Sequence, residues 1–375
     1  MTHDPFRPSD RAQNIKPSGI RKLFELGLSM KNPIDLSIGQ AHFDVPEVSK
    51  TAAIRAIQEG KNRYTVTQGI PQMREALKAR YAKRFADVSD CETMVTLGVS
   101  GGLMLTYLAL LNPGDEVLIP DPYFIMYRHL ATMVGAKAVT YDTYPDFRQL
   151  AERIAPRITP RTRLILVNSP SNPTGAAMTE AEARAVAKLA DERGIGLVSD
   201  EIYEDFIYDG RHVSPREFTR NCIVLSGASK SLGMPGWRLG WLLAPRDLCE
   251  RMYTLQQFSF VCAPAPLQHG ALAGLDFDFS AYREEYRRKR DLMVEGLKER
   301  FRVVKPGGAF YLFSGLPEGM NVEKFIEACT ARELLVVPGN ACSERATHFR
   351  LCYASTDDKL KRAVDILNDI ARKGV

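Results

Sequence analysis

The sequence has no long hydrophobic run, no block of like charge and no apolar leader. No stretch reaches about 18 consecutive apolar residues, the length that a membrane-spanning helix needs, so no membrane partner is expected. The net charge of +5 comes from 50 basic and 45 acidic residues spread along the chain, which argues against nucleic-acid binding. The first ten residues carry charges and two prolines where a secretory leader would be apolar, so we expect a cytoplasmic protein.

Cysteine and histidine are also too dispersed to indicate a covalent or metal-bound framework. The seven cysteines are an odd number, lie far apart and include no C-x-x-C pair, which is typical of reduced thiols. The six histidines never fall at i and i+4 and never flank a pair of cysteines. We therefore expect neither a disulfide scaffold nor a metal site.

What the sequence does contain is a regular alternation of short apolar runs and longer helical patterns. At about 150 residues per domain, 375 residues suggest one large and one small domain. Between about residues 95 and 245 the runs are VTL, EVLIP, AKAVTY, RLILVNSP, GIGLVSDE, CIVLSG and GWLLAP. Their alternation with helices predicts an α/β fold, in which the large domain has a mostly parallel sheet flanked by helices.

The pattern changes after Pro264-Ala265-Pro266. A charged helical stretch, FSAYREEYRRKRDLMVEGLKER, is followed by PGGAFYLF and by the strand-like THFRLCYA. Residues 1 to about 45 show little regular pattern and are expected to form an arm that docks elsewhere. We therefore predict a large domain over residues 46–279, and a smaller α+β domain built from the N-terminal arm, residues 1–45, and the C-terminal segment, residues 280–375.

Ligands of an open parallel sheet bind beyond the carboxyl ends of its strands, so the residues there are the candidates for a site. Gly98-Val99-Ser100-Gly101-Gly102 follows the run VTL and leads into the helical run LMLTYLALL. The free N–H groups and the positive end of such a helix suit a phosphate. The alternative is a glycine-rich turn that only reverses the chain.

Two further strand ends carry polar side chains. Asn172 precedes a proline, which favours an extended backbone that can hold its amide toward the cleft; the alternative is an ordinary Asn-Pro turn. Asp200 and Tyr203 follow the run GLVS, where a buried acid needs a cationic partner such as a protonated nitrogen of a ligand. The alternative for Asp200 is the N-cap of a helix.

Lys230 and Arg238 follow a fourth strand end. A lysine is usually a solvated surface charge, but Lys230 lies between a predicted buried strand and a segment of small residues. Desolvation there would lower its pKa and make the amine nucleophilic. Arg238 offers a planar guanidinium that can bind a phosphate through two hydrogen bonds. Together, the four strand ends supply the groups that would hold a phosphorylated aromatic aldehyde as an imine.

The same motifs carry a resemblance to a known family. NPTG, DEIY, SKSLGMPGWRLG and FRLCYA occur in this order, and residues 36–354 resemble the class I and II aminotransferases, fold type I enzymes that use pyridoxal 5′-phosphate. The resemblance implies an enzyme that moves an amino group between an L-amino acid and a 2-oxo acid by a ping-pong Schiff-base mechanism. Those two substrates are its expected partners, and pyridoxal 5′-phosphate is its expected cofactor.

The resemblance implies a catalytic role for three residues. Lys230 would form the Schiff base with the cofactor and would later move the substrate proton. Asp200 would pair with the pyridinium nitrogen and keep the ring an electron sink. Tyr203, together with Asn172, would hydrogen-bond the phenolic oxygen of the ring.

The resemblance also implies contacts to the rest of the cofactor. Val99, Ser100 and Arg238 would hold the phosphate. Phe124 would stack on the ring, with Tyr123 as the less favoured alternative.

Substrate and subunit contacts follow from the same resemblance. Arg350, in the FRL of FRLCYA, would bind the substrate α-carboxylate as a fork, and its alternative is an exposed strand arginine. Gly39 and Asn172 would lie beside the substrate. Tyr64 would reach the phosphate of the neighbouring subunit, so that a homodimer shares its active sites.

One segment departs from the family pattern. Members usually read G-x-P-D-F-x-x-P, whereas this chain reads GQAHFDVP, with Ala41 and His42 in place of the proline and the aspartate. The substitution leaves the substrate preference open, with aspartate, neutral and aromatic amino acids as alternatives.

Two alternatives to transamination stay open. One alternative is a lyase on the same scaffold, such as a C–S β-lyase or an aminocyclopropane-carboxylate-synthase-like enzyme. It would share the cofactor contacts, because these reactions differ only in which bond to the substrate Cα is aligned with the π system of the cofactor. A non-catalytic ligand-binding or regulatory homologue is disfavoured, since Lys230 and Asp200 are both present.

Overall fold

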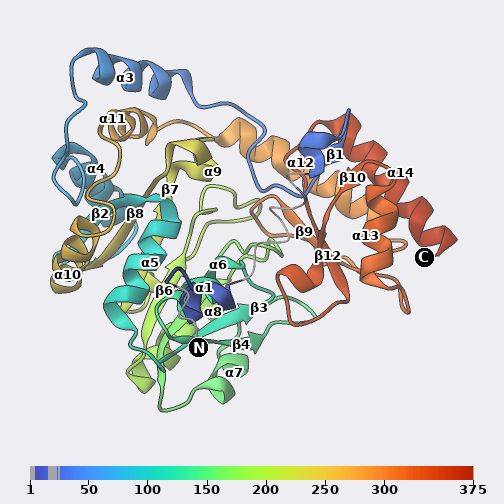
Figure 1. Cartoon of the computed structure of the whole chain (residues 1–375), viewed down its shortest axis with the longest axis horizontal. Coiled ribbons are helices and arrows are strands. Elements are labelled where there is room, and N and C mark those ends of the chain that lie inside the picture. The colour runs from blue at the N-terminus through green and yellow to red at the C-terminus, as the bar shows by residue number, and fades with distance from the viewer. Residues whose placement is uncertain (1–4, 16–22, 24–25, 375) are drawn as a thin grey trace.

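A seven-stranded sheet forms the centre of the larger part of the molecule (Figure 1). The computed structural model of the protein describes residues 5–15, 23 and 26–374. The sheet order is β2-β8-β7-β6-β5-β3-β4, and β8 alone runs antiparallel to its neighbours. The strands are β2 (Cys91–Leu97), β3 (Glu116–Asp121), β4 (Lys137–Asp142), β5 (Thr162–Asn168), β6 (Gly196–Asp200), β7 (Cys222–Gly227) and β8 (Leu239–Pro245). The predicted mostly parallel sheet is confirmed.

Helices cover both faces of this sheet, because successive side chains of its strands point to opposite sides. On β5, Leu164 and Leu166 belong to one apolar cluster, whereas Ile165 and Val167 belong to another, which includes Val186 of α8. The helices are α3 (Glu47–Gln58), α4 (Pro71–Ala82), α5 (Gly98–Leu110), α6 (Met126–Met133), α7 (Ala151–Ile154), α8 (Glu180–Arg193), α9 (Ala228–Ser231), α10 (Arg246–Gln257) and α11 (Ala265–Gly274).

Helix α8 shows how local sequence sets the ends of these elements. The Thr179 hydroxyl accepts the N–H of Glu182 at 3.3 Å, and the Glu182 carboxylate accepts the N–H of Thr179 at 2.6 Å, which closes a capping box. Gly194 ends the helix with φ +62°, a conformation that favours glycine. β6 begins two residues later and leads straight to Asp200.

The C-terminal part forms a separate α+β layer, drawn in orange and red in Figure 1. Its elements are α12 (Ser280–Leu297), β9 (Tyr311–Gly315), α13 (Val322–Thr330), β10 (Leu334–Leu335), β11 (Val337–Pro338), β12 (His348–Cys352) and α14 (Asp357–Lys373). Strands β11, β12 and β9 make an antiparallel sheet against which the helices pack.

The N-terminal segment joins this C-terminal layer. Its strand β1 (Ile34–Asp35) pairs in parallel with β10, and Ile34 and Leu36 are buried in the same apolar cluster as Phe349 of β12. The segment also contains the short helix α1 (Asp10–Asn14); residues 1–4, 16–22 and 24–25 of the predicted arm lie outside the described part of the chain. None of the helices in the described part combines the length and apolarity that a bilayer crossing requires.

Candidate active site

A cavity of about 210 Å³ lies at the carboxyl ends of β5, β6 and β7, between the large sheet and the C-terminal layer. All the site residues predicted from the sequence line it except Tyr64. The predicted residues that line it are Gly39, Val99, Ser100, Phe124, Asn172, Asp200, Tyr203, Lys230, Arg238 and Arg350. The cavity therefore gathers residues that are far apart in the chain, from Gly39 to Arg350.

Lys230 lies on the single turn α9, which follows β7 without a loop. Its Nζ donates to the carbonyl oxygen of Gly39 at 2.6 Å. Burial, which disfavours the ammonium form, lowers the pKa of Lys230 to about 8. An appreciable fraction of the amine is therefore neutral, and nucleophilic, near neutral pH.

Asp200 is the last residue of β6 and is almost completely buried. Its Oδ2 accepts the hydroxyl of Tyr127 at 2.7 Å, and its Oδ1 accepts the N–H of Ile202 at 3.2 Å. Burial raises the pKa of Asp200 to about 6, against the two hydrogen bonds, which favour the anion. The residues that follow form turns, so the alternative of a helix N-cap does not hold.

Arg350 projects from β12 and is only 3% exposed, so it is not an exposed strand arginine. Its Nη1 donates to the Asn172 amide oxygen at 3.1 Å, and its Nη2 donates to the carbonyl oxygen of Ser37. Its Nε is buried without a hydrogen-bond partner among the described residues. A buried cation with a free donor is a site for an anion.

The guanidinium of Arg238 lies beside the first turn of α5. A Cβ at Gly98 would lie 2.7 Å from its Nη2, and a Cβ at Gly240 would lie 2.5 Å from the backbone nitrogen of Val99. Glycine at both positions thus allows the first turn of α5 to lie close to β8 and to the guanidinium of Arg238. Arg238 itself has φ +56°, a strained conformation for a non-glycine residue that often marks a functional site.

Tyr203, just after β6, and Tyr311, the first residue of β9, both line the cavity. Their hydroxyl oxygens are 2.7 Å apart, and the Tyr311 ring lies 4.9 Å below the guanidinium carbon of Arg350. Tyr311 and Tyr127 both line the cavity, yet sequence reasoning did not select them. The available signals were the position of Tyr127, three residues after the predicted stacking residue Phe124, and the position of Tyr311 at the start of an apolar strand.

Phe124 and Tyr64 have very different surroundings. Phe124 lines the cavity, with its ring edge-on to that of Tyr127 at 5.6 Å. Tyr64 is 85% exposed and lies on an open hollow of the surface that is also lined by residues 262–266. Within one chain, Tyr64 does not reach the cavity.

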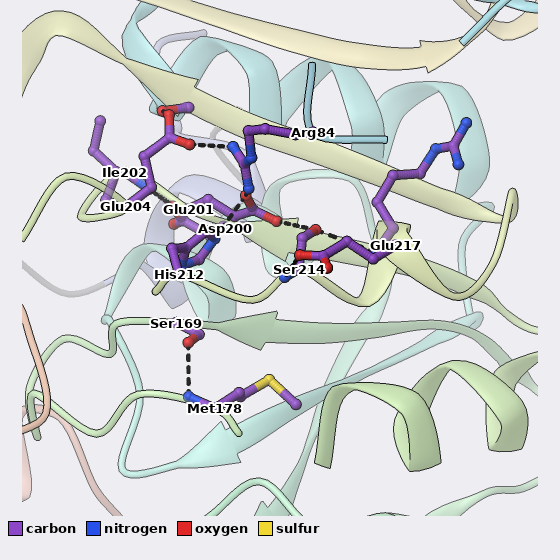
Figure 2. A network of polar contacts seen from close by, with 12 residues as sticks. Arg84, Ser169, Met178, Asp200, Glu201, Ile202, Glu204, His212, Ser214 and Glu217 are labelled. Atoms are coloured by element: carbon purple, nitrogen blue, oxygen red, sulfur yellow. Dashed lines mark hydrogen bonds and ion pairs between the residues drawn. The ribbon is translucent and has the colours of Figure 1, made fainter. Parts of the chain in front are cut away.

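A second network of charges is centred on Glu201, the residue that follows Asp200 (Figure 2). Glu201 is fully buried and meets Arg84 Nη2 at 2.9 Å, His212 Nε2 at 2.8 Å and the hydroxyl of Ser214. Burial opposes its ionisation, but His212 and Arg84 outweigh burial and lower the pKa of Glu201. The guanidinium of Arg84 also contacts Glu204. Arg84 therefore supplies the positive charge between Glu201 and Glu204. The network anchors the chain just after Asp200.

Comparisons with known proteins agree with this geometry. The family described as aminotransferase class I and II matches residues 31–367. A probable aspartate aminotransferase of Methanocaldococcus jannaschii is 38% identical and covers 96% of this chain and 99% of its own length. The aromatic-amino-acid aminotransferase 2 of Thermococcus litoralis is 34% identical, over 97% of this chain and 98% of its own.

Solved structures give the same result. The aspartate aminotransferase of Thermus thermophilus with maleate superposes with a TM-score of 0.90 at 33% identity, covering 97% of this chain and 99% of the other. An aspartate aminotransferase from Rhizobium meliloti gives 0.92 at 31% identity, covering 99% and 100%. With this match extending over nearly the whole chain, the protein belongs to the class I and II aminotransferase family.

Proposed function

We propose that this aminotransferase binds pyridoxal 5′-phosphate in the cavity described above and transfers an amino group between an L-amino acid and a 2-oxo acid. The observation that carries the proposal is the grouping of Lys230, Asp200 and Arg350 around one cavity. The amine of Lys230, with its lowered pKa, suits the cofactor aldehyde, and the buried carboxylate of Asp200 suits the ring nitrogen. The buried guanidinium of Arg350, with its free donor, suits the substrate carboxylate.

The residues present fit the cofactor. Phosphate would be held by the start of α5, at Val99 and Ser100, and by the guanidinium of Arg238, where the lack of a Cβ at Gly98 leaves room for the backbone and the guanidinium to meet. Phe124 lines the same cavity and would cover the ring. Asn172 and Tyr203 would face the phenolic oxygen.

Pyridoxal phosphate, when bound, supplies an electron sink that stabilises negative charge at the substrate Cα. The chain's own groups do the rest. Lys230 would hold the cofactor through its aldehyde carbon, and its amine, once displaced by the substrate amine, would accept and return the Cα proton. Asp200 would keep the ring nitrogen protonated, because a buried anion stabilises a cation beside it. Arg350 orients the α-carboxylate, which points the Cα proton toward Lys230.

The charges that line the cavity bear on the choice of amino donor. The named relatives include aspartate and aromatic-amino-acid aminotransferases. Among the described residues that line the cavity, the cationic ones are Lys230, Arg238 and Arg350, and each already has a proposed partner. We therefore propose that aromatic and neutral amino acids are used at least as well as aspartate.

A half-reaction screen tests this function. Purified holoenzyme is mixed with each common amino acid and no acceptor, and the change in cofactor absorbance is followed. Conversion of the aldehyde form to the amine form, reversed by adding a 2-oxo acid, supports transamination. If no amino acid changes the absorbance of cofactor-loaded enzyme, the proposal is wrong.

The same experiment separates the lyase alternative. A C–S β-lyase or an aminocyclopropane-carboxylate-synthase-like enzyme would turn over repeatedly without an acceptor, whereas an aminotransferase stops after one turnover per site. Initial rates at several concentrations of both substrates should give parallel double-reciprocal lines, the pattern of a ping-pong mechanism.

A homodimer is the assembly that the exposed surface supports. Tyr64 and Phe258 are 85% and 83% exposed, large values for apolar side chains on a monomer. A partner chain would cover them, and its Tyr64 would reach the phosphate of the neighbouring cavity.

We also propose the domain division at residues 46–279, with residues 1–45 and 280–375 forming the arm and the small domain. Helix α3 begins directly after Pro46, and α12 begins at Ser280. A cytoplasmic location is proposed as well, to be tested by fractionating cells that express the tagged chain.

A further inference from the structure

Among the described residues, Tyr127 is the one whose side chain hydrogen-bonds directly to the carboxylate of Asp200. Its hydroxyl donates to Asp200 Oδ2 at 2.7 Å, whereas Oδ1 accepts the backbone N–H of Ile202 at 3.2 Å. Tyr127 is 1% exposed, so water does not compete for this hydrogen bond. The carboxylate is therefore oriented by one donor from the main chain and one from a side chain.

The segment that carries Tyr127 also carries Phe124. The N–H of Tyr127 donates to the carbonyl oxygen of Phe124 at 3.0 Å, and the two rings meet edge-on at 5.6 Å. Phe124 lines the cavity where the ring of the cofactor is proposed to lie. The short segment that leads into α6 thus holds both the residue proposed to cover the ring and the donor to Asp200.

The surroundings of Asp200 make this donor important. Burial disfavours the anion, and the neighbouring negative charge of Glu201 adds to that effect, whereas Lys230 opposes it. Burial also raises the pKa of Tyr127 well above its usual range, so its hydroxyl stays protonated. The Tyr127 hydroxyl donates to the Asp200 carboxylate, and this hydrogen bond lowers the pKa of Asp200 and so favours its charged form.

We propose that Tyr127 is a positioning residue for the ring nitrogen of the cofactor: its hydroxyl holds Asp200 ionised and oriented, and Asp200 in turn holds the nitrogen protonated. This inference rests on the proposed binding of pyridoxal phosphate. Without the hydroxyl, the proton shared by Asp200 and the ring moves toward the carboxylate, and the electron sink is weakened.

The chain offers a matched control in Tyr107. Its side chain is fully buried on α5, but its hydroxyl has no hydrogen-bond partner among the described residues. Tyr127→Phe and Tyr107→Phe therefore remove the same atom from buried positions, and only the first removes a hydrogen bond to Asp200. Replacing Tyr127 with 3-fluorotyrosine keeps the hydroxyl, so this protein shows whether the hydroxyl is enough to preserve wild-type behaviour.

The experiment loads each protein with pyridoxal phosphate labelled with ¹⁵N in the ring and measures the ¹⁵N chemical shift. For Tyr127→Phe we expect a shift toward the unprotonated value and a fall in the half-reaction rate of about tenfold to a hundredfold. Tyr107→Phe and the 3-fluorotyrosine protein should keep the wild-type shift and rate. Thermal melting of all variants identifies any that fail to fold.

Three results would overturn the inference: a wild-type ¹⁵N shift in folded Tyr127→Phe, an equal shift in Tyr107→Phe, or no rescue by 3-fluorotyrosine. Failure of the proposed function looks different. In that case the wild-type protein itself binds no labelled cofactor, and no variant can be compared.

Discussion

The Nζ of Lys230 lies 2.6 Å from the carbonyl oxygen of Gly39, a residue 191 positions earlier in the chain. The contact joins the amine on α9 to the N-terminal segment, whose strand β1 pairs with β10 of the C-terminal layer. The N-terminal segment and the large sheet domain thus meet at the Lys230 amine. The conformation of the residues near Gly39 therefore affects the position of that amine.

Gly39→Ala should perturb the cavity. A Cβ at this position would lie 1.7 Å from the hydroxyl oxygen of Tyr311, so the tyrosine or the backbone has to move. We expect a loss of roughly 1–3 kcal/mol in the free energy of unfolding and weaker cofactor binding. Denaturant unfolding and cofactor titration measure both. Gly236→Ala is the control, since its Cβ meets no atom within 4 Å; equal effects in the two variants would contradict the argument.

The reaction of Lys230 with the cofactor should follow its lowered pKa. The neutral amine is the nucleophile, and burial lowers the pKa to about 8, so the rate of adduct formation by apoenzyme should rise with pH and level off above about 8. Borohydride trapping at each pH measures the adduct. A rate that keeps rising to pH 10 would show an amine with an ordinary lysine pKa, and an adduct trapped on Lys230→Ala would assign the chemistry to another residue.

Arg350→Lys should weaken substrate binding. Lysine cannot supply two parallel donors to a carboxylate. It also cannot keep the contact with Asn172 and offer a free donor at the same time, as Arg350 does. We expect KM for the amino acid to rise by about tenfold or more, the loss of roughly one charge-assisted hydrogen bond. Steady-state kinetics measure this change, with cofactor occupancy checked by absorbance. An unchanged KM would place the carboxylate elsewhere.

Mixing two inactive variants tests whether the sites are shared. If Tyr64 of one subunit completes the site of the other, a mixed dimer of Tyr64→Ala and Lys230→Ala contains one site with neither change. Activity should then appear after the two proteins are unfolded and refolded together, although each alone is impaired. If Tyr64 acts within its own chain, or does not act at all, co-refolding restores nothing beyond the sum of the separate activities.

Several features of the fold could be predicted because their signals are local. The capping box of Thr179 and Glu182 involves residues three apart, and the periodicity of α8 and of β6 is contained within each segment. The site residues at the ends of β5, β6 and β7 followed from one rule, that ligands bind at the carboxyl edge of a parallel sheet. Asn172, Asp200 and Lys230 do lie around one cavity.

Other features could not be predicted, because they depend on contacts between distant segments. Nothing in the run PGGAFYLF indicates that Tyr311 meets Tyr203, which lies 108 positions earlier. Similarly, nothing in the sequence distinguishes Tyr127 from the other tyrosines among the 14, because its contact with Asp200 depends on the packing of α6 beside the end of β6. The exposed position of Tyr64 also emerges only from the folded chain.

The sequence by itself determined the mostly parallel sheet, the family resemblance and the set of groups at the strand ends, since these follow from short-range periodicity and from ordered motifs. Only the tertiary structure decided which residues surround those groups. The burial of Asp200 and the donor from Tyr127 arise where α6 packs beside the end of β6, and the contact of Lys230 with Gly39 arises where the N-terminal segment reaches α9. Desolvation depends on that packing, and it is desolvation that moves the pKa of Lys230 down and that of Asp200 up.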